Sequence, residues 1–228
     1  MLTRRLFVAL SPQFDKIFRG FGRPKEPDKT GLGLKEALSV GIENAVQILG
    51  RPDGYFRNEL IKILLPPPFK AVERAMRFAG LSGMLDQFVQ SMNRAAEAAA
   101  PFAKDIFVSA LKDMTFDDAR RILTGSDTAA TEFFRLKTTG RLGDLFKPVV
   151  QRTMSDVGVT NQYQTLASKL KTIPFVKVES LDLDQYVVDK AMAGLFFTLG
   201  EEEKKIRTNP AARVTSLLKE VFGGIKPR

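Results

Sequence analysis

The chain has 228 residues, of which 44% are hydrophobic and 27% are charged, a balance typical of a globular protein rather than a disordered one. It contains neither cysteine nor histidine. Disulfides, Cys–His or Ser–His–Asp nucleophiles, haem ligation and the usual zinc and di-iron sites are therefore excluded. No apolar run approaches the roughly eighteen residues of a membrane span, and no nucleotide-binding glycine motif follows a predicted strand.

Positive charge is concentrated at the start of the chain. Residues 1–35 carry eight basic and three acidic side chains, which is +5 of the total net charge of +9. The rest of the chain is only mildly basic, and it has no basic stripe interleaved with aromatic residues. Nucleic-acid binding is therefore not expected.

Residues 1–21 have the pattern of a targeting segment. Their apolar residues recur at helical spacing, their basic residues include Arg4, Arg5 and Arg19, and Asp15 is the single acid. An arginine-rich, acid-poor amphipathic start is typical of mitochondrial transit peptides, so we expect a mitochondrial location. Two other interpretations stay open: a terminal helix packed on the domain, or a helix lying on a membrane surface.

The next residues read as a linker, because residues 22–31 contain two prolines and several charges. We therefore divide the chain into an N-terminal segment with its linker, residues 1–31, and a single helical domain, residues 32–228. The sequence does not decide whether the first segment is cleaved from the mature protein.

Helical periodicity dominates the first half of this domain. Apolar residues recur at intervals of three and four in five successive segments, which are 34–49, 69–79, 81–100, 101–112 and 116–123. A short apolar run at 60–65 precedes three prolines, which we expect to lead into the second of these helices. Thr115 and Asp118 have the spacing of a capping box at the start of the last one.

Residues 129–157 are predicted to form one long helix or a pair of collinear helices. Ala129, Phe133 and Leu136 begin its apolar stripe, and Gly158 is placed to end it. Phe134 lies about 100° around the helix from Phe133, so it is predicted to lie off the core stripe. We therefore take Phe134, together with Phe196 of the doublet at 196–197, as candidate contacts for an apolar partner or ligand.

A polar cluster on the same helix is a second candidate contact, for an anion or a protein partner. Its members are Arg135, Lys137, Thr138, Thr139 and Arg141. We expect Gly140 and Gly143 to flank or interrupt the helix, which would leave backbone N–H groups beside the arginines to bind phosphate or carboxylate. A surface salt bridge, for example from Glu132 to Arg135, is the favoured alternative.

The last part of the chain is also predicted to be helical. Helices are expected at 160–170, from Asp182 through 207 with a kink near Gly200, and at 211–222, with an extended connector at 173–176. The fold class is thus all-α, a multi-helix bundle of about nine helical segments with negligible β-structure.

Acidic residues in this part are expected to have structural roles. Asp182 and Asp184 are the most visible pair for a calcium or magnesium ion, but helix capping is favoured. Glu201 and Glu203 stand four residues before Lys205 and Arg207, the favourable order for ion pairs on a solvent-exposed helix face.

Several motifs occur in an order that resembles a bacterial family, the domain of unknown function numbered 4197. They include Asn93-Arg94-Ala95-Ala96-Glu97, Leu181-Asp182-Leu183-Asp184-Gln185-Tyr186-Val187 and Gly200-Glu201-Glu202-Glu203-Lys204-Lys205-Ile206-Arg207. The resemblance covers about residues 34–223. It implies a helical fold and carries no established activity or catalytic residue. Many members begin with an export signal, so the resemblance implies the bacterial periplasm as the alternative location.

No catalytic residue, cofactor or metal site is predicted. We expect a non-enzymatic accessory or scaffold subunit that acts through protein–protein contacts in a larger organellar assembly, with membrane association left open. The alternative is a soluble carrier of an apolar or acyl ligand in a bundle cavity, and an enzyme using only carboxylates, serine or lysine comes third. A dry cavity of several hundred Å³ would favour the carrier, whereas a solid core with exposed apolar faces would favour the subunit.

Overall fold

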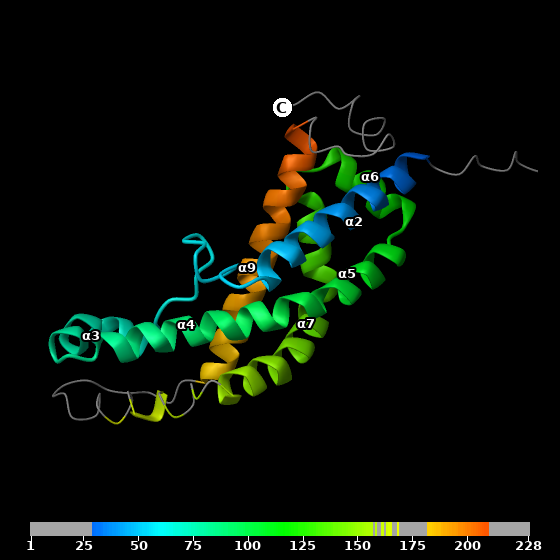
Figure 1. Ribbon diagram of the computed structural model, residues 1–228. Helices are drawn as coiled ribbons and strands as arrows, with labels where there is room; N and C mark the ends of the chain where they lie inside the picture. The colour runs from blue at the N-terminus through cyan, green and yellow to red at the C-terminus, as the bar shows by residue number, and fades with distance from the viewer. Residues whose placement is uncertain are drawn as a thin grey trace, which may run out of the picture.

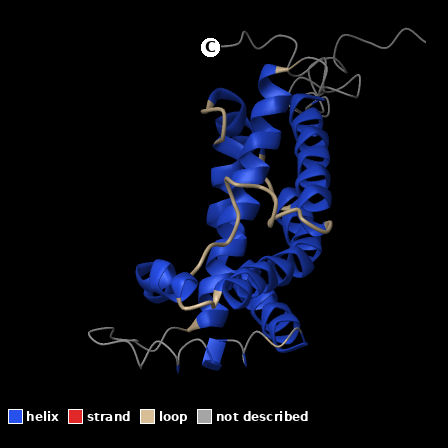
Figure 2. Cartoon of the chain, turned by 60° about the vertical axis from the view of Figure 1, so that its left-hand side comes forward, coloured by secondary structure: helices blue, strands red, loops and turns tan. Residues whose placement is uncertain are grey.

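The computed structural model describes residues 29–156 and 182–209, together with residues 158, 161, 163–165 and 168. Within these residues there are seven α-helices, one 3-10 turn and no strand, so the protein is all-α (Figure 1; Figure 2). The elements are α2 (Lys29–Gly50), α3 (Pro67–Phe78), α4 (Ser82–Ala99), the 3-10 turn η1 (Ala100–Phe102), α5 (Ala103–Lys112), α6 (Phe116–Thr124), α7 (Ala129–Asp156) and α9 (Leu183–Thr208). The expected number of about nine segments is slightly too high.

The predicted helix positions are otherwise close to those observed. Helix α2 begins at Lys29, so residues expected in the linker already belong to the helix. Helix α9 is continuous from Leu183 to Thr208 and passes through Gly200 without a break. The predicted helices at 1–21 and 211–222 and the connector at 173–176 lie outside the described residues, as does most of the helix predicted at 160–170.

Three predicted helix ends are confirmed by their hydrogen bonds or dihedral angles. The Thr115 hydroxyl accepts from the Asp118 backbone N–H at 3.2 Å while the Asp118 carboxylate accepts from the Thr115 N–H at 3.1 Å, a complete capping box. Asp182 caps α9 by accepting from the Gln185 N–H at 2.9 Å. Gly158 follows α7 with a φ of 71°, the left-handed conformation that glycine adopts readily.

Helices α7 and α9 lie antiparallel at the centre of the molecule. At one end Glu203 of α9 accepts from the Ala130 N–H of α7 at 2.9 Å, and at the other Gln151 of α7 donates to Asp184 of α9 at 3.0 Å. Helix α2 packs along α9, and α4 packs on both central helices (Figure 1). Helix α3 contacts α4 at the end remote from α2, so it forms one extremity of the molecule (Figure 1).

Three buried phenylalanine rings join the inner helices. Phe107 of α5 contacts Phe134 of α7 and Phe196 of α9, with ring centroids 5.4 and 5.9 Å apart. Both contacts are edge-on, the arrangement that the ring quadrupoles favour, and each such pair stabilises by about 0.5–1.5 kcal/mol beyond the area it buries.

The prediction for the two phenylalanine doublets is therefore wrong about which ring is free. Phe134 and Phe196 are buried, while Phe133 is half-buried and Phe197 is exposed. The reason is that the buried residues of α7 are spaced four apart and include a polar residue, Thr138. They are Ala130, Phe134, Thr138, Leu142, Phe146, Val150 and Met154. A stripe drawn through apolar residues alone shifts to Leu136, whose side chain is 83% exposed.

In the acidic run at 201–203 only Glu201 lies on the solvent-exposed face that was predicted, whereas Glu202 and Glu203 are buried. The Glu203 carboxylate is buried and accepts from the backbone N–H groups of Ala130 and Thr131, at 2.9 and 2.8 Å, and from the Thr131 hydroxyl at 2.9 Å. Arg207 pairs with it at 2.8 Å, as the four-residue spacing predicted. The carboxylate therefore satisfies the first amides of α7, which have no partner within their own helix.

Lys205 has a different partner from the predicted one, which was Glu201. Lys205 pairs with buried Glu202 at 2.6 Å rather than with exposed Glu201. Asn44 of α2 donates to the same Glu202 carboxylate at 3.1 Å. The acidic motif therefore fixes α9 against both α7 and α2.

A tyrosine from the loop after α2 packs against a glycine of α9. The buried Tyr55 hydroxyl donates to the Ala191 carbonyl at 2.7 Å, and the Tyr55 ring lies against Gly194. A Cβ atom at position 194 would stand 2.5 Å from the ring, so only glycine permits this approach. Burial raises the pKa of the Tyr55 phenol, and the nearby Glu97 carboxylate adds to the shift.

Candidate interaction surface

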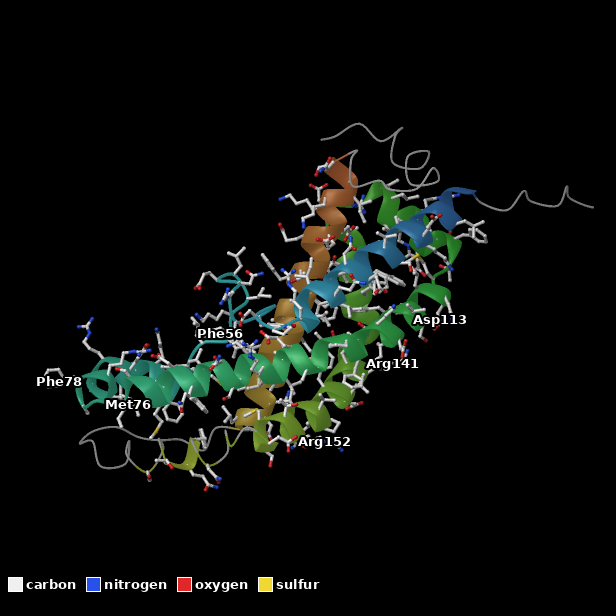
Figure 3. All side chains as sticks on the ribbon, viewed as in Figure 1. Phe56, Met76, Phe78, Asp113, Arg141 and Arg152 are labelled. Carbon is white, nitrogen blue, oxygen red and sulfur yellow. The ribbon has the colours of Figure 1, made fainter. Side chains whose placement is uncertain are left out.

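The polar residues predicted as an anion or partner contact are only partly on the surface. Arg135, Lys137, Thr139 and Arg141 are exposed along α7, and Figure 3 shows Arg141 on that helix. Thr138 is buried, and its hydroxyl donates to the Phe134 carbonyl at 2.6 Å. Thr138 is therefore a core residue, and its assignment to a contact surface is wrong.

The backbone part of that prediction is wrong as well. Helix α7 runs without interruption from Ala129 to Asp156, through both Gly140 and Gly143. Residues in the middle of an α-helix donate their N–H groups to carbonyls of the preceding turn, so these glycines offer no amides to an anion.

Arg135 is already engaged within the chain. Its guanidinium lies 4.6 Å from the centroid of the Phe196 ring, and its Nε atom lies 3.5 Å from the Glu132 carboxylate. The predicted Glu132–Arg135 ion pair is confirmed. The stacking on Phe196 covers that core ring from the solvent side, a role that lysine fills less well.

A more developed surface site lies at the other end of the molecule. We call it the loop–α3 groove, a hollow of about 420 Å³ formed by residues 56–65, α3 and α4. Its apolar floor consists of Phe56, Leu64, Leu65 and Val89. Its charged lining consists of Lys62, Lys70, Glu73, Arg77 and Asp86. Figure 3 places Phe56 on the loop above α4, and Phe78 at the outer tip of α3.

The charges in the groove are held in a fixed arrangement. Lys70 and Arg77 bond to the Glu73 carboxylate at 2.9 and 3.0 Å, and Arg77 also reaches Asp86 of α4 at 2.9 Å. These hydrogen bonds, first that of Lys70 and then that of Arg77, lower the pKa of Glu73. Glu73 is therefore ionised at neutral pH, and α3 is tied to α4 by a continuous ion-pair network.

The loop that forms one wall is held by the motif at 93–97. The Asn93 side chain accepts from the Ile63 N–H at 2.9 Å and donates to the Ile63 carbonyl at 2.8 Å. The buried Glu97 carboxylate accepts from the N–H groups of Tyr55 and Phe56, at 3.1 and 3.2 Å. Two polar side chains of α4 thus provide hydrogen-bond partners for backbone groups of this loop.

Arg94 completes the attachment of the loop. It bridges Glu97, at 2.6 Å, and Asp53, at 2.7 Å. The bond to Glu97, followed by that to Asp53, raises the pKa of Arg94, so its guanidinium stays charged. The motif at 93–97, which the sequence analysis noted only for its resemblance to a family, therefore has a structural role: it fixes the loop that forms one wall of the groove.

Several large apolar side chains of the loop and of α3 are exposed to solvent. Phe78 is 96% exposed, Leu60 is 77% exposed and Leu64 is 51% exposed. Sequence reasoning did not single out these residues, because a helical pattern over 69–79 does not show which of its apolar side chains the rest of the fold leaves uncovered. The signal that existed was the short apolar run at 60–65, which was noted without a role.

Other classes of site are not supported in the described part of the chain. No group of three or more acidic residues is placed to hold a metal ion there. No helix among these residues is long and apolar enough to cross a membrane.

Comparison with known families gives the same family that the order of the sequence motifs indicated. A model described as a protein of unknown function, DUF4197, matches residues 26–223. No curated protein and no solved structure gives a match. The match spans the whole set of described helices, including the Asn93–Glu97 and Glu201–Arg207 motifs. The chain belongs to the DUF4197 family.

Proposed function

We propose that the protein is a non-enzymatic accessory or scaffold subunit that binds a protein partner through the loop–α3 groove. The observation that carries this proposal is the combination of an apolar floor and charged lining residues in one groove, with Leu64 of that floor 51% exposed. Protein interfaces have this anatomy, with an apolar centre surrounded by polar groups. Apolar side chains gathered in solvent at one site mark such surfaces more reliably than scattered ones.

The partner should present a segment that is partly apolar and partly acidic. The floor of the groove accepts an apolar side chain, and Lys62 and Lys70 on its wall suit a carboxylate. Arg74 is exposed four residues after Lys70 and extends the positive edge along α3. The chain as a whole carries a net charge of +9, which favours encounter with an acidic partner.

The interior supports this proposal over that of a ligand carrier. The hollow inside the bundle beside Phe134 measures about 10 Å³. Pockets for ligands of ordinary size have volumes of about 300–1,000 Å³. The larger hollows lie on the surface and are partly open.

The charges of the groove also favour binding over catalysis. A carboxylic acid that donates a proton near neutral pH needs a raised pKa, and Glu73 has a lowered one. Its ion pairs with Lys70 and Arg77 instead give the groove a fixed shape.

The compartment is a separate part of the proposal, and it rests on residues 1–21, which lie outside the described residues. We place the subunit in the mitochondrion. A fluorescent reporter carrying these residues should enter mitochondria. A diffuse cytosolic signal would remove the compartment from the proposal without touching the groove.

The groove is tested by comparing two double variants with the wild-type chain in complexes recovered from the source cells. Leu64→Ser with Lys70→Glu changes the groove. Leu136→Ser with Arg141→Glu makes matched changes at exposed positions of α7. We expect the groove variant to lose partner on the order of tenfold, about 1.4 kcal/mol, and the α7 variant to retain it.

Thermal melting of both variants separates loss of contact from loss of fold, since all four side chains are exposed. Equal recovery of the partner by the groove variant and the wild type would overturn the proposal. Loss of the partner by the α7 variant alone would move the contact surface to the Arg135–Arg141 side of the molecule.

A further inference from the structure

A second surface hollow lies at the opposite end of the molecule, between the start of α2 and the start of α6. It measures about 400 Å³, and its wall includes Leu32, Lys35, Met114, Phe116 and Ala119. We call it the α2–α6 groove. It is far more apolar than the loop–α3 groove, since Lys35 is the single charged residue among those that line it. Leu32 is 54% exposed and Phe116 is 69% exposed there.

The end of α9 is attached beside this groove. Arg207, in the last turn of α9, donates to the Ile122 carbonyl of α6 at 2.8 Å. Helix α9 ends at Thr208, and Asn209 then adopts extended backbone angles, φ −109° and ψ 108°. Figure 1 shows the end of α9, helix α6 and the start of α2 at the same end of the molecule.

The distance from this point to the groove is short. Phe116 precedes Ile122 by six residues on α6, which is about 9 Å along the helix axis. An extended chain covers about 3.3 Å per residue, so a few residues beyond Asn209 are enough to reach Phe116.

The sequence after Asn209 has the composition that the groove requires. Apolar residues recur at helical spacing on one stripe, namely Val214, Leu217, Leu218, Val221 and Phe222. Arg213 and Lys219 lie off that stripe. Asp113 at the end of α5 and Asp117 in the first turn of α6 are exposed near the groove and provide complementary charge (Figure 3 shows Asp113).

We propose that residues 214–222 dock in the α2–α6 groove as an amphipathic helix, with their apolar stripe covering Leu32 and Phe116. This intramolecular contact goes beyond the proposed function and leaves the loop–α3 groove available to a partner. Residues 1–28 are the rival occupant, because they directly precede α2. The family match favours the C-terminal segment, since it extends to residue 223 and begins at residue 26, after the apolar positions of the first segment.

The absence of cysteine from the chain makes a direct test clean. Phe116→Cys is combined, one at a time, with cysteine at a stripe position, Leu217 or Leu218, or at a position off the stripe, Thr215 or Ser216. Each full-length double variant is oxidised and its disulfide mapped within the monomer. We expect efficient closure for the stripe positions and at least severalfold slower closure for the others, because a disulfide needs Cβ atoms about 3.5–4.5 Å apart.

A second measurement does not depend on disulfide geometry. Leu218→Asp should increase amide hydrogen exchange in residues 31–38 and 115–120, whereas Ser216→Asp should leave it unchanged. Equal disulfide yields at stripe and off-stripe positions would overturn the proposal. So would disulfides that form between two chains, or closure of Phe116→Cys with Phe18→Cys in place of the C-terminal positions.

Discussion

The Glu203 carboxylate of α9 accepts both the backbone N–H and the hydroxyl of Thr131 in α7, at 2.8 and 2.9 Å. An acid on one helix therefore caps the start of another, and the same carboxylate pairs with Arg207 at 2.8 Å. This network lies where α6, α7 and α9 meet, because Arg207 also donates to the Ile122 carbonyl of α6.

Removal of this cap should be severe. Glu203→Ala leaves two backbone amides without their acceptor and removes the carboxylate that pairs with Arg207, so we expect a loss of about 3–5 kcal/mol in the free energy of unfolding. Glu203→Gln, which keeps one acceptor oxygen, should cost less. Glu201→Ala, at an exposed position two residues away, is the control and should change stability by less than about 0.5 kcal/mol. Similar urea midpoints for the alanine variants at 201 and 203 would contradict the buried cap.

Two glycines in different helices should respond in opposite directions to alanine. At Gly194 a new Cβ would stand 2.5 Å from the buried Tyr55 ring, so Gly194→Ala should destabilise by about 1–3 kcal/mol. At Gly140 nothing lies within 4 Å of the added Cβ, so Gly140→Ala should stabilise α7 by about 0.5–1 kcal/mol. Thermal unfolding of the two variants measures both signs. A stabilised Gly194→Ala protein would mean that Tyr55 does not pack on α9 as described.

The fold was largely predictable from the sequence, because its helices carry strong periodicity and clear caps. Thr115–Asp118, Asp182 and Gly158 are local signals, and each was identified correctly. The positions of Glu202 and Glu203 were not predictable in the same way. A glutamate four residues before an arginine gives the same sequence pattern whether the pair lies on a solvent-exposed face or is buried against the first turn of a neighbouring helix.

The candidate site was predictable to a smaller extent. Asn93 and Glu97 were noticed as part of a motif, but their partners are backbone groups 30 to 42 residues earlier in the chain, which no local pattern reveals. The exposure of Phe78 also depends on tertiary structure, because the helical pattern alone does not show that α3 has few neighbours. Thr138 misled the sequence analysis for the reverse reason, since it is a polar residue on a buried line.

The corrected assignment of the central doublet has a measurable consequence. Phe134→Ala should lose about 3–5 kcal/mol of stability, the usual cost of deleting a buried aromatic ring. Phe133→Ala should lose distinctly less, because that ring is half-buried. Chemical denaturation of both variants decides the order. The reverse order would restore the stripe expected from the apolar residues alone.

The buried Tyr55 phenol should make the protein sensitive to alkali. The pKa of Tyr55 is raised in the folded state, whereas a tyrosine in the unfolded chain titrates at about pH 10. The unfolded chain therefore releases this proton first, so stability is intact below about pH 10 and falls as the pH rises above it. Tyr55→Phe should abolish this part of the loss, seen as a smaller difference between urea midpoints at pH 9 and at about pH 10.5.

Tyr186 provides the comparison. Partial burial also raises the pKa of this half-buried tyrosine, so Tyr186→Phe should have an effect of the same sign and smaller size. Identical alkaline profiles for wild type and Tyr55→Phe would show that the Tyr55 hydroxyl is not held against the Ala191 carbonyl in solution.

Partner binding at the loop–α3 groove is tested most directly by site-specific photo-crosslinking in the source cells. A photoreactive amino acid replaces Leu64 in the groove or, as the control, Leu136 on α7, both exposed side chains in a chain of 25.4 kDa. We expect position 64 to crosslink one defined protein in near-stoichiometric yield, and expect Lys70→Glu to abolish that product, while position 136 gives none. A chain that migrates as a free monomer and crosslinks no protein from position 64, or the same protein from both positions, would contradict the assignment of the groove.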